Sequence, residues 1–141
     1  MILVDANVAL YAHHRQLPQH EVASRWFGSA LSGSETIGFT SNVVLAFLRI
    51  STSSRVLERP LDMKTACEVV DGWFSSSITA LVEPGSRYWQ LLRALLIDYR
   101  VRADLTSDAH LAAIALENGA QIVTTDRDFA RFKSVQVRYL E

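Results

Sequence analysis

Short apolar runs alternate along the chain with longer segments of helical periodicity. The runs at residues 2–4, 36–40, 78–82 and 121–124 are short and apolar, and β-branched residues occur in each of them. This pattern is typical of strands buried on both faces. Residues 135–140 alternate between apolar and polar side chains, which predicts a last strand at the edge of a sheet.

The segments between these runs predict amphipathic helices. Pro18 ends the first helix, which begins after Asp5, and Gly119 ends the helix that begins at Asp108. Further helices are expected at 19–31, at 42–50 after a cap at Ser41, after Asp62, and after Ser86. Because strands and helices alternate, we expect an α/β fold with a parallel sheet of about five strands and helices on both faces.

The periodicity also predicts which side chains face the core. The expected buried set includes six large aromatic residues: Trp26, Phe27, Trp73, Phe74, Trp89 and Tyr99. Cys67 is expected in the core, and the adjacent His13 and His14 are expected at the surface, pointing in different directions. One small domain does not bury every large apolar side chain, so those left exposed predict a partner surface.

Composition and charge narrow the possible partners. The 141 residues carry a formal net charge of −1, so a polyanion must be held by local arginines or by a metal ion. A single cysteine rules out an intrachain disulfide and suits a reducing compartment such as the cytoplasm. No basic region followed by a long apolar segment opens the chain, and no apolar run reaches membrane-spanning length. We therefore expect one domain, residues 1–141, with neither a signal peptide nor a membrane partner.

Four aspartates occupy comparable positions in the predicted elements. Asp5 follows the first strand, Asp126 follows the fourth with Asp128 just beyond it, and Asp108 lies in the first turn of a helix. The carboxyl ends of parallel strands meet at one edge of a sheet, where ligands bind. Taken singly, Asp5 is also a typical helix cap, Asp108 a partner of a helix dipole, and Asp126 and Asp128 typical turn residues. The hypothesis of a site therefore depends on the joint pattern.

Carboxylates that converge in this way favour a bound cation. Their mutual repulsion is relieved by a divalent ion, and oxygen ligands alone select Mg²⁺ or Mn²⁺ rather than zinc. Such an ion orients a phosphate, activates a bound water and stabilises the leaving oxygen. The pattern therefore indicates hydrolysis of a phosphodiester. Glu117 and Asp104 are expected in solvent, outside this cluster.

Several motifs resemble those of the PIN-domain ribonucleases of the VapC toxin type, from bacterial toxin–antitoxin pairs. The matching segments follow the family's order along nearly the whole chain: residues 3–7 (LVDAN), 47–49 (FLR), 84–85 (PG), 108–113 (DAHLAA) and 125–129 (TDRDF). The resemblance implies a PIN-like three-layer fold and Mg²⁺-dependent endonuclease action on RNA (tRNA, rRNA or mRNA), leaving 5′-phosphate and 3′-hydroxyl ends. It also implies a homodimer and inhibition by a small VapB-type antitoxin.

The resemblance also assigns roles to residues. It makes Asp5, Asp108 and Asp126 the acidic site, with Asn7, Thr125 and Asp128 as supporting polar groups. The family usually has a glutamate at the position that aligns here with Ala46, and this departure weakens any two-metal model. Arginines near the predicted site edge are candidates for phosphate contacts, with solvated surface as the alternative for each: Arg49, Arg55, Arg59, Arg102 and Arg127.

Two other functions remain open. An aspartate after the first strand also suits phosphoryl transfer through an aspartyl nucleophile, but the usual second aspartate is replaced by Asn7. Alternatively, the chain is a catalytically weak or inactive PIN-domain protein that binds RNA or a partner, which Ala46 would favour. Metal-dependent cleavage of RNA by the purified protein distinguishes the three hypotheses.

Overall fold

The computed structural model describes all 141 residues and contains one five-stranded sheet. Its strand order is β3-β2-β1-β4-β5, and all neighbouring strands are parallel. The strands are β1 (Ile2–Val4), β2 (Ile37–Phe39), β3 (Thr79–Leu81), β4 (Gln121–Thr124) and β5 (Val137–Tyr139). The predicted parallel sheet is confirmed, and β5 is an edge strand as expected.

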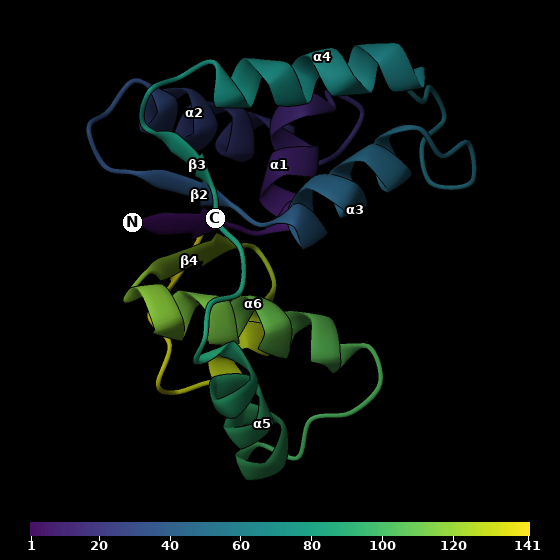
Figure 1. The fold of residues 1–141 in the computed structure, drawn as a ribbon. Coiled ribbons are helices and arrows are strands. Elements are labelled where there is room, and N and C mark those ends of the chain that lie inside the picture. Colours follow the sequence, from purple (N-terminus) through teal and green to yellow (C-terminus); the bar gives the residue numbers. More distant parts are fainter.

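Helices cover both faces of the sheet (Figure 1). One layer holds α1 (Ala6–His13), α2 (His20–Leu31), α3 (Ser41–Ser51) and α4 (Met63–Phe74). The other holds α5 (Tyr88–Asp98) and α6 (Leu105–Asn118). A short 3₁₀ helix, η1 (Arg127–Arg131), joins β4 to the last strand. The predicted three-layer arrangement is therefore confirmed.

Aromatic side chains fill the space between the sheet and the α1–α4 layer. Trp73 of α4 is almost fully buried and stacks on Phe39 of β2, with the ring centroids 4.7 Å apart. Phe27 and Phe47 pack against the same indole. Burial of each such ring contributes about 1.5–3 kcal/mol to the free energy of unfolding. This aromatic cluster is therefore a main source of stability for the layer formed by α1–α4.

The two adjacent histidines lie inside this layer, not at the surface. His14 is buried and its Nε2 lies 2.8 Å from the Ser51 hydroxyl. His13 is half-buried, with Nδ1 2.8 Å from the Ala9 carbonyl oxygen, and its Nε2 accepts a hydrogen bond from Trp73. The prediction of surface residues was wrong because adjacent positions on a helix can both find polar partners when neighbouring helices enclose them. Burial lowers the pKa of both imidazoles.

Three further residues that were predicted in the core are exposed. Phe74, the last residue of α4, is 36% exposed. Cys67 is exposed on α4, where Ala66 and Trp73 take the buried positions. Trp89 is 63% exposed, and Leu95 is the buried residue of α5. Helix α5 begins at Tyr88, with Arg87 and not Ser86 at the N-cap position. Helix α5 packs against α6, on the side of α6 that faces away from the sheet. Much of the surface of α5 therefore remains accessible to solvent.

The helix starts that border the carboxyl edge of the sheet also differ from prediction in detail. Helix α3 is capped by Thr40, whose hydroxyl accepts a hydrogen bond from Val43, and not by Ser41. Helix α6 begins at Leu105, three residues earlier than predicted, and Asp108 lies in its first turn as expected. Gly119 ends α6 in the left-handed conformation (φ 59°), as its position predicted. None of the helices is long and apolar enough to cross a lipid bilayer.

Candidate metal centre

Three carboxylates converge at the carboxyl edge of the sheet. They belong to Asp108 on α6, Asp126 just after β4, and Asp128 in η1, and one oxygen from each lies within 4.8 Å of the others. Asp108 and Asp126 are half-buried and Asp128 is exposed, so the cluster is open to solvent on one side. This spacing is compatible with a single cation held by one oxygen from each residue.

Asp5 lies beside this group but outside the set of three. Its Oδ1 accepts a hydrogen bond of 2.8 Å from the Ala6 amide, and its Oδ2 accepts one of 2.7 Å from the Thr124 hydroxyl. Both oxygens thus have a protein donor, and the residue also caps α1. The structure therefore combines the two interpretations of Asp5 that the sequence left open, since the cap is real and the side chain still adjoins the acidic cluster.

The hydroxyl of Thr124 connects the ends of the two central strands. It donates to Asp5 and accepts a 2.9 Å hydrogen bond from the amide of Asp126. The side-chain amide nitrogen of Asn7 lies 3.5 Å from the same oxygen, and Asn7 Oδ1 accepts a hydrogen bond from the Thr125 amide. The structure thus brings Asn7 next to Thr124 and Thr125, and its supporting role in the site stays a prediction. Thr125, in contrast, contributes a backbone group, and the supporting hydroxyl is that of Thr124.

Strand register is the signal that could have identified Thr124. Val4 pairs with Val123 across β1 and β4, so the next residues on the two strands, Asp5 and Thr124, lie side by side. Register between distant strands is not encoded locally, since it depends on how the whole sheet assembles. The sequence alone therefore placed Thr124 in a strand without a role.

Crowding and burial shift the protonation of two of these carboxyls. Burial first, and then the charges of Asp126, Asp5 and Asp128, raise the pKa of Asp108 from 3.8 to about 7. Burial also raises the pKa of Asp5, and the charge of Asp126 adds to the effect. A cation placed among these groups would favour their ionised forms, which is the electrostatic condition that a metal site requires.

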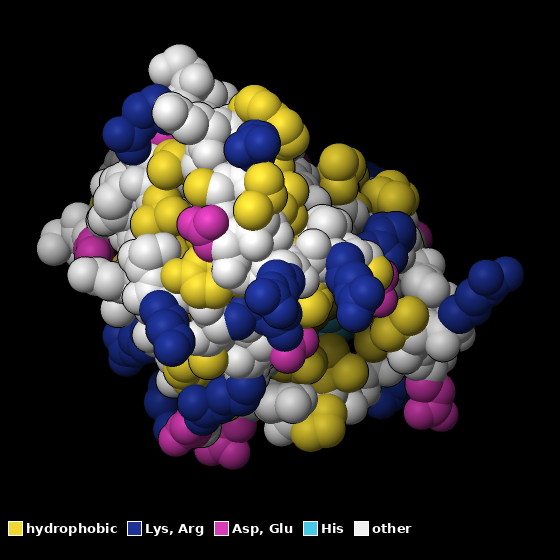
Figure 2. Space-filling model, turned by 90° about the horizontal axis from the view of Figure 1, so that it is seen from below, with side chains coloured by type: hydrophobic (Ala, Val, Ile, Leu, Met, Phe, Trp, Pro, Cys, Tyr) yellow, Lys and Arg dark blue, Asp and Glu magenta, His cyan; other side chains and the backbone are white.

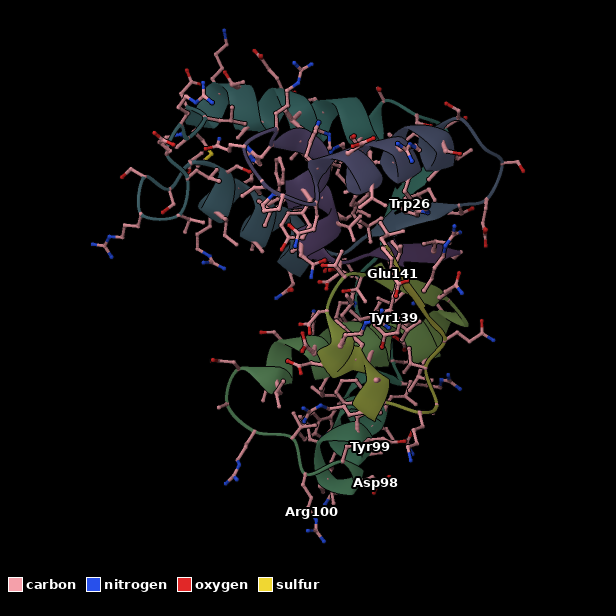
Figure 3. All side chains as sticks on the ribbon, turned by 180° about the vertical axis from the view of Figure 1, so that it is seen from behind. Trp26, Asp98, Tyr99, Arg100, Tyr139 and Glu141 are labelled. Atoms are coloured by element: carbon pink, nitrogen blue, oxygen red, sulfur yellow. The ribbon has the colours of Figure 1, made fainter.

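None of the arginines predicted from the sequence forms a hydrogen bond or an ion pair with the acidic cluster. Arg127 pairs with Glu141, and its guanidinium lies 4.3 Å from the centre of the Tyr139 ring; Tyr139 and Glu141 lie close together in Figure 3. The other four are exposed and form no ion pair: Arg49, Arg55, Arg59 and Arg102. The cation whose charge reaches Asp108 is instead Arg131, which sequence reasoning had not singled out.

Glu117 is also placed differently from the prediction. Its two carboxylate oxygens accept hydrogen bonds of 2.7 Å from the Gly85 amide and 2.9 Å from the Arg87 amide, just before α5 begins. It is half-buried and acts as a link between α6 and the turn before α5, whereas Asp104 is exposed as expected. A carboxylate at the start of a helix also interacts favourably with the helix dipole.

Comparison with known proteins places this geometry in a family. The model of the PIN domain matches residues 2–135. Over 136 residues the chain is 40% identical to ribonuclease VapC37 of Mycobacterium tuberculosis, a match that covers 96% of this chain and 94% of that protein. The chain belongs to the VapC family of PIN-domain ribonucleases. The resemblance predicted from the sequence motifs is thereby confirmed, and so is the enzyme class that it implied, a nuclease.

Other members of the VapC family show the same relationship. Ribonuclease VapC33 of Mycobacterium tuberculosis is 38% identical, with 96% of this chain and 95% of that protein covered. The fold matches that of VapC20 of the same organism, described as a sarcin–ricin loop cleaving toxin, with a TM-score of 0.72, 16% identity and coverage of 98% and 99%. It also matches VapBC2 from Rickettsia felis, bound to a DNA fragment from its promoter, with a TM-score of 0.71, 17% identity and full coverage of both chains.

Proposed function

We propose that this VapC-family chain is the toxin of a toxin–antitoxin pair, a Mg²⁺-dependent endoribonuclease that hydrolyses RNA phosphodiester bonds to inhibit translation and growth. The observation that carries the proposal is the cluster of Asp108, Asp126 and Asp128 at the carboxyl edge of the sheet. All the ligand atoms are hard oxygens, which suit Mg²⁺, with Mn²⁺ as a substitute. The substrate class is RNA, in the form of tRNA, rRNA or mRNA.

The four aspartates have two different roles in this proposal. Asp108, Asp126 and Asp128 would hold the ion, which when bound supplies an activated water and stabilises charge on the phosphate. Asp5 fixes the position of Asp126 through their shared partner, the Thr124 hydroxyl, and adds negative charge behind the ligands. Hydrogen bonding of this kind around ligands tunes both their orientation and their affinity for metal.

The partners follow from the same family relationship. We infer that a VapB-type antitoxin inhibits the protein, because VapBC complexes from Salmonella typhimurium and Rickettsia felis share the fold. An inhibitor facing clustered carboxylates would present arginine, whose planar fork pairs with a carboxylate. We also propose a homodimer, residues 1–141 as a single PIN domain, and a reducing, cytoplasmic location that suits the single cysteine.

A cleavage assay with matched variants tests the proposed function. Purified protein is incubated with total tRNA, ribosomes and a structured mRNA in Mg²⁺, in Mn²⁺ and in EDTA. We expect cleavage in either metal and none in EDTA. Asp126→Asn should reduce the rate by at least about a hundredfold, because it removes a ligand charge while preserving the side-chain shape.

Asp98→Asn is the matched control for this assay. Asp98 is an exposed aspartate at the end of α5, at the foot of the molecule in Figure 3, and its variant should cleave like the wild type. Asp5→Asn should also abolish cleavage with little change in melting temperature. The amide oxygen can still accept the hydrogen bond from Ala6, and removal of a buried charge beside Asp126 offsets the lost acceptor for Thr124. RNA binding without metal-dependent cleavage of any substrate would contradict the proposal and support the inactive alternative.

A further inference from the structure

Arg131 occupies a fixed position at the end of η1. Two residues near Arg131, Phe129 and Phe132, are each 1% exposed and anchor this segment of the chain in the core. Arg131 Nε donates a 3.2 Å hydrogen bond to the carbonyl oxygen of Asp128. The amide of Asp128 in turn donates to Asp126 Oδ1 over 2.8 Å. Arg131 is therefore connected through the backbone of one candidate ligand to the side chain of another.

The terminal nitrogens of this guanidinium are unused. They form no hydrogen bond and no ion pair within the structure, although the charge acts on the nearby Asp108 carboxyl. Arg127, four residues earlier in the same 3₁₀ helix, is in contrast engaged by Glu141 and the Tyr139 ring. Arg131 is thus half-buried, held at one nitrogen, and free to donate from the two others.

RNA needs such a group at this site. The chain has a net charge of −1, and the acidic cluster repels a phosphate wherever the cation does not fully screen it. A guanidinium presents two parallel N–H donors that match two oxygens of one phosphate, which a point charge such as lysine does not. A donor pair beside the metal ligands would bring the backbone of the RNA to the cation.

We propose that Arg131 binds the two non-bridging oxygens of one RNA backbone phosphate next to the acidic cluster, through its two terminal nitrogens, while Nε stays bonded to the Asp128 carbonyl oxygen. This inference rests on the proposed ribonuclease function. Arg131 then contributes to substrate binding, and the ion is held without it. Its removal should affect the affinity for RNA and leave the affinity for the metal intact or slightly higher, because a nearby positive charge is lost.

The test compares Arg131→Gln with Lys133→Gln. Lys133 is an exposed cation two residues further on, and its side chain forms no ion pair with the cluster. For Arg131→Gln we expect KM for a cleaved RNA to rise about tenfold with a smaller change in kcat, as for the loss of one charge-assisted pair. The salt dependence of RNA affinity should weaken by about 0.7 in the log–log slope, the value for one contact on a single strand. Lys133→Gln should change neither quantity.

Three further measurements decide how the result is interpreted. Mn²⁺ affinity, measured by calorimetry without RNA, should be unchanged or tighter in Arg131→Gln. Weaker Mn²⁺ binding would overturn the proposal in favour of a purely structural role.

Arg131→Lys should reverse part of the rise in KM, since it restores the positive charge without the paired N–H donors of a guanidinium. It also serves as the test variant if Arg131→Gln does not fold. Equal KM and salt slope in wild type and Arg131→Gln would overturn the inference, whereas failure of the wild type to cleave any RNA would overturn the proposed function itself.

Discussion

At the scale of single residues, Asp108 responds strongly to its surroundings. It is half-buried in α6 and faces other carboxylates, so its charged form is unfavourable in the absence of a cation. Its pKa of about 7 means that the metal-free protein carries a proton there near neutral pH. Metal binding must displace this proton, so the affinity for Mg²⁺ should rise with pH through this range.

This protonation makes the stability of the metal-free protein depend on pH. The folded pKa of Asp108 is raised above the unfolded value of 3.8, so its stabilising contribution is complete below 3.8 and is lost as pH rises through about 7. We expect Asp108→Asn to exceed the wild type in melting temperature in EDTA, by a larger margin at pH 8 than at pH 5. Comparing the two proteins at each pH cancels the contribution of groups that the substitution leaves unchanged.

Excess Mg²⁺ provides the control for this prediction. It should raise the melting temperature of the wild type at pH 8, and raise that of Asp108→Asn by less, because the variant lacks one ligand charge. If the two metal-free proteins differed by the same amount at pH 5 and pH 8, the raised pKa of Asp108 would be wrong.

The site residues that were predicted from the sequence are positioned by local structure, whereas those that were missed are positioned by contacts between distant segments. The four aspartates of the site region follow strands or open helices, and local patterns place such ends well. Thr124 and Arg131 depend instead on register and on the path of a 3₁₀ turn. His13 and Glu117 depend on contacts between helices far apart in the chain. Local sequence carries little information about either kind of contact, which is why these residues were missed.

At the scale of elements, a residue of α6 supplies the hydrogen-bond acceptor that the N-terminus of α5 lacks. Arg87 at the N-cap of α5 makes no side-chain capping hydrogen bond. Glu117, near the end of α6, supplies the missing acceptor. Its carboxylate oxygens accept hydrogen bonds from the backbone amides of Gly85 and Arg87. A Cβ at Gly85 would lie 2.7 Å from Glu117 Oε2, so glycine lets the carboxylate approach this closely.

Removal of this acceptor should destabilise the α5–α6 layer. Glu117→Ala leaves two amides without their partner, so we expect the free energy of unfolding to fall by about 1–2 kcal/mol, as for loss of a helix cap. Urea denaturation measures this. Glu21→Ala is the control, because Glu21 only pairs with Arg25 on the exposed surface, where such pairs contribute at most about 0.5 kcal/mol. Equal losses in the two variants would mean that the Glu117 contacts add nothing to stability.

The order and type of the elements could be predicted, but the orientation of the outer helices could not. Strands buried on both faces carry a strong apolar signal, and β1 and β4 are of this kind. Helix α5 has apolar residues around most of its circumference, so periodicity does not decide between Trp89 and Leu95 as the buried one. The choice is made by packing against α6, which the sequence does not show directly.

At the scale of the whole molecule, the α5 face has the composition of a contact surface. Trp89 and Ile97 are 63% and 57% exposed, about two helical turns apart on α5. Figure 2, seen from below, shows exposed apolar side chains with Lys and Arg side chains among them on this side of the molecule. The expectation that some large aromatic residues remain exposed holds for Trp89 and Phe74, whereas Phe27 and Trp73 lie in the core as the periodicity predicted.

We therefore expect the proposed homodimer to depend on the α5 face. Trp89→Glu places a charge at an exposed indole and should raise the dimer dissociation constant by about thirtyfold, equivalent to the ~2 kcal/mol of an aromatic interface residue. Light scattering over a concentration series measures this shift. Val56→Glu is the control, because Val56 is 60% exposed but lies between α3 and α4, in the layer on the other side of the sheet. A wild-type monomer at micromolar concentration would contradict the dimer, whereas a dimer weakened by Val56→Glu and not by Trp89→Glu would move the interface to the α3–α4 layer.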